Sequence, residues 1–226
     1  MGDDLSQHDA SRTDLKQTER TTVRRLAERG RHDRASVNGI LDEAYIAHVG
    51  FVVDGAPKVL PMAFGRIDDV LYLHGAVGNA MLRASADAEV CVTVTLLDGL
   101  VLARSAFHHS MNYRCVVLFG TATRVDDETE QRLALEAVVD HTLAGRTADA
   151  RGVTPAEQRK TLVLRLPIDE GSAKIRTGQP VDDDADQDLA VWAGIVPLRL
   201  VSGEPQQDPA QSVPGLSPPP PESLRR

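Results

Sequence analysis

The stretch YIAHVGFVVDGAPKVLPMAFGR, residues 45–66, decides the fold class of this chain. It contains two mostly apolar runs separated by Asp54 and Gly55. An Asp-Gly pair accepts the positive φ angles that a tight hairpin turn requires, so two antiparallel strands are predicted here.

Further strands follow at intervals of eight to twelve residues, which is the spacing of an antiparallel barrel. Along residues 88–97 the sequence places Val90, Val92, Val94 and Leu96 on one face, and Asp98-Gly99 is predicted as the next turn. The other predicted strands cover residues 70–75, 113–125, 160–168 and 172–177.

A few helices are predicted around the strands. Ser36 is a candidate cap for a helix that places Val37, Ile40, Leu41 and Ala44 on one face. Thr154-Pro155-Ala156-Glu157 has the pattern of a capping box. The remaining predicted helices cover residues 13–31, 77–87 and 127–145.

The charge balance and the apolar runs exclude several classes of protein. The chain has 25 Lys and Arg against 33 Asp and Glu, a net charge of −8, which argues against nucleic acid as a partner. It has no apolar run long enough to span a membrane and no signal layout at its start. We therefore expect a cytoplasmic protein without a membrane or nucleic-acid partner.

Composition predicts three regions. Residues 1–23 are expected to be a flexible N-terminal segment, and residues 24–201 a folded domain. Seven of the 13 prolines lie from Pro205 onwards, so residues 202–226 are predicted to form a disordered, proline-rich tail.

Polar side chains occur within four segments that otherwise resemble barrel walls: residues 58–65, 73–83, 104–114 and 191–198. Buried polar groups need partners, and a polar ligand held against the barrel would supply them. In the second segment a strand leads through glycine into a helix, whose free backbone N–H groups suit a phosphate.

The histidines do not predict a metal site. His108 and His109 are adjacent, so on an extended chain they point in opposite directions and cannot easily chelate one ion. His48 and His141 lie on apolar faces and are predicted to pack in the core or an interface.

Four linked segments in one order carry a family resemblance: residues 40–76, 92–122, 172–178 and 191–198. Over roughly residues 24–200 the chain resembles the flavin-nucleotide-binding branch of the pyridoxamine 5′-phosphate oxidase-like superfamily, which includes nitroimidazole-resistance proteins. The resemblance implies a β-dominated α+β fold, a split β-barrel with a few peripheral helices. It also implies a homodimer with FMN at the subunit interface.

The same resemblance implies a set of cofactor-binding residues. They are Lys58, Val59, Leu60, Pro61, Met62, His74, Gly75, Asn79, Ala80, Met81, Arg83, Ser110, Asn112, Tyr113, Arg114, Lys174 and Trp192. His74 is also the candidate catalytic residue, for substrate positioning or proton transfer.

One departure from the family pattern concerns the phosphate. Relatives often have an arginine just before the residues Met-Leu-Arg, or a Ser-Arg-Lys run, where this chain has Asn79, Ala80 and Met81. Two phosphate-binding side chains are therefore missing, and Lys58, Arg83, Arg114 or Lys174 would have to compensate together with the helix N-terminus. FMN is the expected cofactor, and FAD, a deazaflavin or haem are the alternatives.

The expected function is that of an FMN-binding oxidoreductase. It would transfer hydride or electrons from a reduced nicotinamide, NAD(P)H, to a small organic acceptor. Oxidation of pyridoxamine 5′-phosphate itself is not expected, because no second basic cluster is evident for the substrate phosphate. The alternative is a non-catalytic protein that binds or carries flavin or haem.

Overall fold

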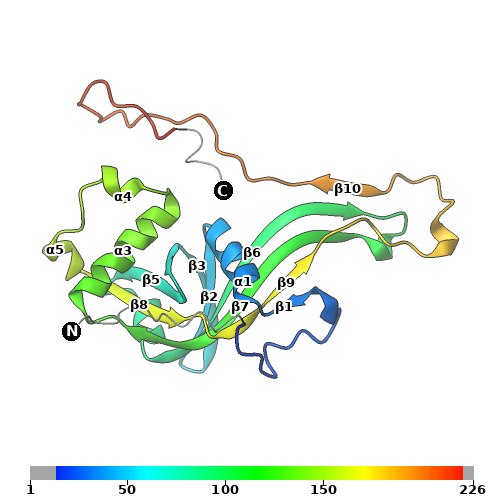
Figure 1. Cartoon of the computed structure of the whole chain (residues 1–226), viewed down its shortest axis with the longest axis horizontal. Coiled ribbons are helices and arrows are strands. Elements are labelled where there is room, and N and C mark those ends of the chain that lie inside the picture. Colours follow the sequence, from blue (N-terminus) through cyan, green and yellow to red (C-terminus); the bar gives the residue numbers. More distant parts are fainter. Residues whose placement is uncertain (1–13, 221–226) are drawn as a thin grey trace, which may run out of the picture.

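Strands dominate the computed structural model, which describes residues 14–220 (Figure 1). The strands are β1 (Gly30–Arg31), β2 (Ala47–Val53), β3 (Ala56–Met62), β4 (Phe64–Ile67), β5 (Val70–Ala76), β6 (Ala88–Leu102), β7 (Ser110–Arg124), β8 (Thr161–Pro167), β9 (Glu170–Arg176) and β10 (Gly194–Pro197). The α-helices are α1 (Arg34–Glu43), α2 (Ala80–Ser85), α3 (Glu128–Thr142), α4 (Arg146–Asp149) and α5 (Pro155–Gln158). Three short 3₁₀ helices are η1 (Ala27–Arg29), η2 (Ala106–His108) and η3 (Asp184–Asp186).

The strands pair antiparallel in the order β3-β2-β6-β7-β8-β5-β4, while β9 pairs with β7 and β10 with β6. The predicted first hairpin is confirmed, because β2 and β3 pair directly and Asp54 and Gly55 have φ angles of 52° and 77°. β3 pairs with β2 alone among the described strands, so its outer edge is open.

The core fills the inside of this barrel. Val90, Val92 and Val94 on β6 are buried and Leu96 packs against them, as the alternation predicted. Val37, Ile40 and Leu41 close the core from α1, so the apolar face of this helix is confirmed. Its cap is Asp33 rather than Ser36, because the Asp33 side chain accepts a hydrogen bond from the Ser36 nitrogen at 2.8 Å.

A second, smaller cluster lies under α3, which covers β4, β5 and β8 (Figure 1). Its buried members are Tyr72, Val125, Ala134, Leu135 and Val163. The predicted capping box at the start of α5 is also confirmed, with both Thr154 and Glu157 hydrogen bonds present.

β6 and β7 form a long hairpin that projects away from the barrel (Figure 1). The predicted turn at Asp98-Gly99 is wrong: the β6–β7 pairing shifts register there, and β6 continues to Leu102. The reason is β10, which pairs with this part of β6. A Cβ on Gly99 would lie 3.1 Å from the Val196 carbonyl oxygen, so glycine permits the close approach.

The helix predicted over residues 13–31 is also wrong, although residue 13 lies outside the described part. Leu15 is buried in the core, and the Lys16 backbone N–H donates to the Asp169 carbonyl at 2.7 Å. The chain continues through turns to η1 and β1. Pairing with distant residues therefore outweighs the helical tendency of this charged stretch.

The structure does not describe either end of the chain. Residues 1–13 of the predicted flexible segment and 221–226 of the predicted tail lie outside the described part. Residues 198–220 form no helix or strand and run above the barrel toward α4 (Figure 1). Across residues 14–220, no helix combines the length and apolar character needed to cross a membrane.

Candidate functional site

The open edge of β3 gathers several of the predicted cofactor residues. Val59 and Leu60 are 62% and 46% exposed, and Lys58 and Pro61 are exposed beside them. Met62 instead packs against the core. Unpaired backbone groups and exposed apolar side chains therefore lie together on this strand, as the isoalloxazine edge of a flavin requires.

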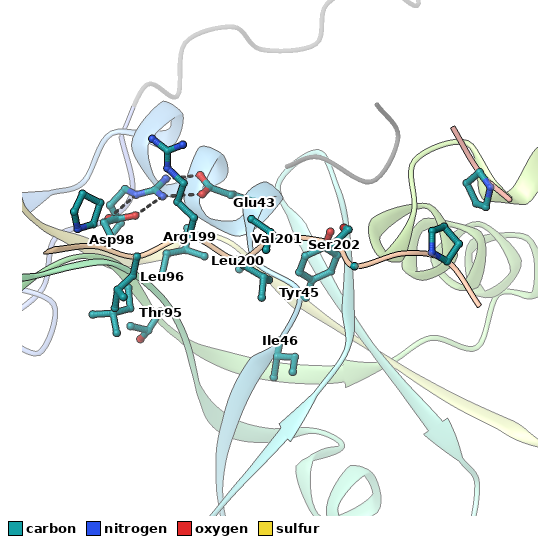
Figure 2. A pocket seen from close by; sticks show the side chains of 18 of the residues that line it. Glu43, Tyr45, Ile46, Thr95, Leu96, Asp98, Arg199, Leu200, Val201 and Ser202 are labelled. Atoms are coloured by element: carbon teal, nitrogen blue, oxygen red, sulfur yellow. Dashed lines mark hydrogen bonds and ion pairs between the residues drawn. The ribbon is translucent and has the colours of Figure 1, made fainter. Parts of the chain in front are cut away.

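A trough of about 1930 Å³ lies between strands β2, β3 and β6 on one side and the C-terminal segment, residues 197–205 and 217–220, on the other. His48, Pro61, Thr95 and Leu97 contribute to its sheet side. Figure 2 shows Leu200 and Val201 of the C-terminal segment near Ile46 and Tyr45. His48 is thus exposed within the chain, so of its two predicted places the core is wrong and an interface stays a prediction.

The charges in the trough do not suit a phosphate. Its lining contains three carboxylates, those of Glu43, Asp98 and Glu204, and only two guanidinium groups, those of Arg114 and Arg199. A phosphate group binds where the electrostatic potential is positive, and the trough lining carries no excess of positive charge.

Arg114, a predicted cofactor residue, is engaged by two carboxylates of the protein. Its guanidinium bonds both oxygens of Glu43, at the end of α1, and both oxygens of Asp98, at the β6 bulge. These carboxylates raise the Arg114 pKa well above its ordinary value. The residue therefore connects α1, β6 and β7, and its charge is already neutralised.

The strand-to-helix turn between β5 and α2 carries the predicted phosphate site. Asn79 caps α2, and its side-chain oxygen accepts from the backbone N–H groups of Met81 at 3.0 Å and Leu82 at 3.3 Å. These donors are not free for a ligand, which corrects the prediction of an open helix N-terminus. Met81 is buried in the core, whereas Arg83 is exposed on the outer side of α2.

His74 lies on β5 directly before this turn. Its strand neighbours Leu71 and Leu73 face the barrel core, while Tyr72 faces the cluster under α3. His74 alternates with Leu73 and pairs in register with Val163, so it lies on the Tyr72 side of the sheet. Its Nδ1 is buried and bonds to no described residue, and burial lowers the His74 pKa below its ordinary value.

Tyr72 beside it is held as a neutral phenol. Its hydroxyl donates to Glu130 at 2.9 Å, and burial together with this carboxylate raises the Tyr72 pKa to about 12. The outer face of β5 therefore presents two uncharged ring systems at neutral pH.

Asn112 lies on β7 of the projecting hairpin and is bonded to residues at the end of β9 and just after it. It is buried, donates to the Gly178 carbonyl at 3.2 Å and accepts from Arg176. The sequence did not indicate these partners, which lie more than 60 residues away along the chain.

The remaining predicted residues lie on separate elements. Ser110 begins β7, Tyr113 pairs in register with Arg176, and the Lys174 ammonium group lies 3.4 Å from the Arg25 carbonyl oxygen. Trp192 is 64% exposed, and its ring lies close to Gly194 at the start of β10. Within one chain, the predicted cofactor residues therefore form two separate groups. Lys58, Val59, Leu60 and Pro61 lie on β3, and the residues from His74 to Arg83 lie on β5, the following turn and α2.

Two solved structures are similar to this chain over most of its length. The flavocytochrome Anf3 from Azotobacter vinelandii is 38% identical, with a TM-score of 0.83 over 89% of this chain and 94% of that one. The FAD and heme binding protein from Mycobacterium smegmatis is 38% identical, with a TM-score of 0.82 over 87% and 97%.

A third structure is more distant. A candidate 5-nitroimidazole antibiotic resistance protein from Bacteroides thetaiotaomicron is 27% identical, with a TM-score of 0.53 over 65% of this chain and 86% of that one. No curated protein matches the sequence. The family profile described as pyridoxamine 5′-phosphate oxidase matches residues 33–175. The chain therefore belongs to the pyridoxamine 5′-phosphate oxidase-like family and has its split-barrel fold.

Proposed function

We propose that this protein binds a flavin and a haem and transfers electrons from a reduced nicotinamide to a small acceptor. The observation that carries the proposal is the half-buried His74 imidazole, neither of whose nitrogens bonds to a described residue. Support comes from the two relatives at 38% identity, whose names include flavocytochrome and FAD and heme binding.

The β3 edge fits a flavin ring. Val59 and Leu60 offer exposed apolar surface, Pro61 lacks an N–H group, and the other backbone groups on this open edge are free to bond the pyrimidine atoms. Lys58 provides a cation on the same strand and forms no ion pair with a described residue.

FAD is proposed in preference to FMN. The α2 N-terminus, where an FMN phosphate was expected, is closed by the Asn79 cap, and Arg114 is neutralised by two carboxylates. A flavin in this chain must therefore be anchored differently. The name of the Mycobacterium smegmatis relative favours the dinucleotide form.

When bound, the flavin supplies two-electron hydride acceptance and the haem supplies one-electron transfer. The chain's own contribution is to hold the ring systems, exclude water and keep His74 uncharged. We propose a homodimer as the working form, because β3, β6, β7 and β10 all carry exposed apolar side chains. These are Val59, Leu60, Leu97, Leu100, Met111 and Val196.

An absorption spectrum tests the proposal. The freshly purified full chain, incubated with FAD and haemin and passed through gel filtration, should retain both flavin bands and a Soret band. Anaerobic NADPH should then bleach the flavin band and shift the haem bands. A protein that retains neither ligand would overturn the proposal, and one that retains both but ignores NADPH would limit it to binding.

A further inference from the structure

Four of the six histidines in the described part have their nitrogens near protein oxygens. The pairs are His32 Nε2 with the Thr21 carbonyl at 3.3 Å, His108 Nε2 with the Asp183 carboxylate at 3.3 Å, His109 Nδ1 with the Ser105 carbonyl at 2.9 Å and His141 Nε2 with the Ala44 carbonyl at 2.7 Å. His141 also packs against the Phe64 ring. His48, His74 and His108 lack a hydrogen-bond partner among residues 14–220, but the buried His108 Nε2 lies against the Asp183 carboxylate.

His48 and His74 have different surroundings. His48 is exposed in the trough, where water can satisfy its nitrogens. His74 is half-buried, and its Nδ1 is enclosed without a partner, whereas Nε2 is not enclosed in this way. A haem iron binds a neutral imidazole, and burial keeps His74 neutral by lowering its pKa.

Small residues follow His74 on β5. Gly75 lies on the opposite face of the strand, and Ala76 is the next residue on the His74 face, where Tyr72 precedes the imidazole. A Cβ on Gly75 would lie 2.8 Å from Leu82 Cδ1, so this glycine also lets α2 approach β5. Val77 is 48% exposed at the same turn and adds apolar surface.

Two cations flank this turn. Lys160 lies beside it, because the Val77 backbone N–H donates to the Lys160 carbonyl at 3.0 Å. Arg83 is exposed on α2. Neither side chain forms an ion pair or hydrogen bond with a described residue, which is notable in a chain of net charge −8. Haem carries two propionates, and two unpaired cations beside an imidazole suit them.

We propose, building on the function above, that His74 is the axial ligand of the haem iron and that Arg83 and Lys160 bind its propionates. In this account the β3 edge holds the flavin, and the outer face of β5 with the β5–α2 turn holds the haem.

Haemin titration of His74→Ala tests the ligand assignment, with His48→Ala and His109→Ala as matched controls. His74→Ala should lower haemin affinity by at least about tenfold and change the Soret band, whereas both controls should keep the spectrum of the unmodified protein. Added imidazole should restore the Soret band of His74→Ala. His74→Tyr, which substitutes an oxygen ligand, should give a spectrum distinct from both. Circular dichroism and FAD affinity check that each variant is folded.

Arg83→Ala/Lys160→Ala tests the propionate contacts, with Arg25→Ala/Arg159→Ala as a control pair of equal charge change. The first pair should weaken haemin binding by roughly 3- to 10-fold while keeping the Soret position. The control pair should leave haemin affinity unchanged.

The possible outcomes separate this inference from the proposed function. If the unmodified protein gives no Soret band with haemin, haem binding fails and the ligand assignment fails with it. If the unmodified protein binds haemin and folded His74→Ala gives the same spectrum and affinity, only the assignment to His74 is wrong. A lost band in His48→Ala alone would move the ligand to the trough.

Discussion

Asn79 Oδ1 lies 3.0 Å from the backbone nitrogen of Met81, so the first turn of α2 is capped by its own chain. The family pattern places a ligand phosphate near this helix end. Here the Asn79 side chain occupies the Met81 and Leu82 N–H groups. The basic side chains that the family resemblance implies are missing at the next two positions, Ala80 and Met81, so the turn lacks both the charge and these two donors.

Asn79→Ala should lower the free energy of unfolding by about 1 kcal/mol, because two backbone N–H groups lose their acceptor. Asn79→Asp keeps a capping oxygen and should retain most of this stability. Urea unfolding of both variants measures the difference. Equal stability for Asn79→Ala and the unmodified protein would show that the cap contributes nothing.

The Glu43–Arg114–Asp98 cluster should behave as a structural clamp. Its side chains are 28–36% exposed, so solvent screens them partly, and we expect Arg114→Gln to cost about 1–2 kcal/mol. A double-mutant cycle with Glu43→Gln measures the coupling from urea unfolding. The coupling should be clearly favourable, and a value near zero would contradict the clamp.

His74 should make the ligand-free protein less stable below neutral pH. Its pKa in the folded chain lies below the ordinary 6.5, so the unfolded chain binds the proton more tightly. Stability is therefore fully present above pH 6.5 and decreases as the pH falls from 6.5 toward the folded pKa.

His74→Gln should remove this part of the pH dependence. Unfolding free energies measured at pH 7.5 and at about pH 5.5 check it, because Asp and Glu with lowered pKa values act only at still lower pH. The same loss of stability in both proteins would assign the effect to another group.

Asp182 should fix the hairpin tip, which consists of residues 103–109. Its side chain is 1% exposed and accepts from the backbone N–H of Arg104 at 2.9 Å and of Ser105 at 3.2 Å. Burial would raise the Asp182 pKa, but these bonds and the Arg104 guanidinium outweigh it and lower the pKa.

Asp182→Asn should therefore cost about 1–3 kcal/mol and accelerate hydrogen exchange at Arg104 and Ser105. Asp188→Asn, an exposed aspartate later in the same segment, is the control and should change exchange little. Unchanged exchange at the tip in Asp182→Asn would show that other contacts hold it.

The two Asp-Gly pairs show how far sequence could predict the fold. Asp54-Gly55 makes the predicted turn, because its flanking runs pair with each other. Asp98-Gly99 has the same residues and lies inside β6, because β10, almost 100 positions later, pairs with the strand there. Local signals sufficed where the partner was local and failed where it was distant.

The candidate site shows the same contrast between features with a local sequence signal and features that depend on distant residues. The exposed apolar edge at Val59 and Leu60 and the position of His74 before the turn followed from the sequence and the family resemblance. The engagement of Arg114 by Glu43 did not, because these residues are 71 positions apart and only the folded barrel brings them together. The closed end of α2 had a local signal, since Asn is a favoured cap. This cap engages the N–H groups that the predicted phosphate site requires.

The central claim is that this chain holds both a flavin and a haem. The most direct measurement is the absorption spectrum of the full chain after incubation with FAD and haemin and removal of free ligand by gel filtration. We predict flavin bands and a Soret band that both elute with the protein. A colourless protein peak would contradict the account, as would a peak that carries flavin alone.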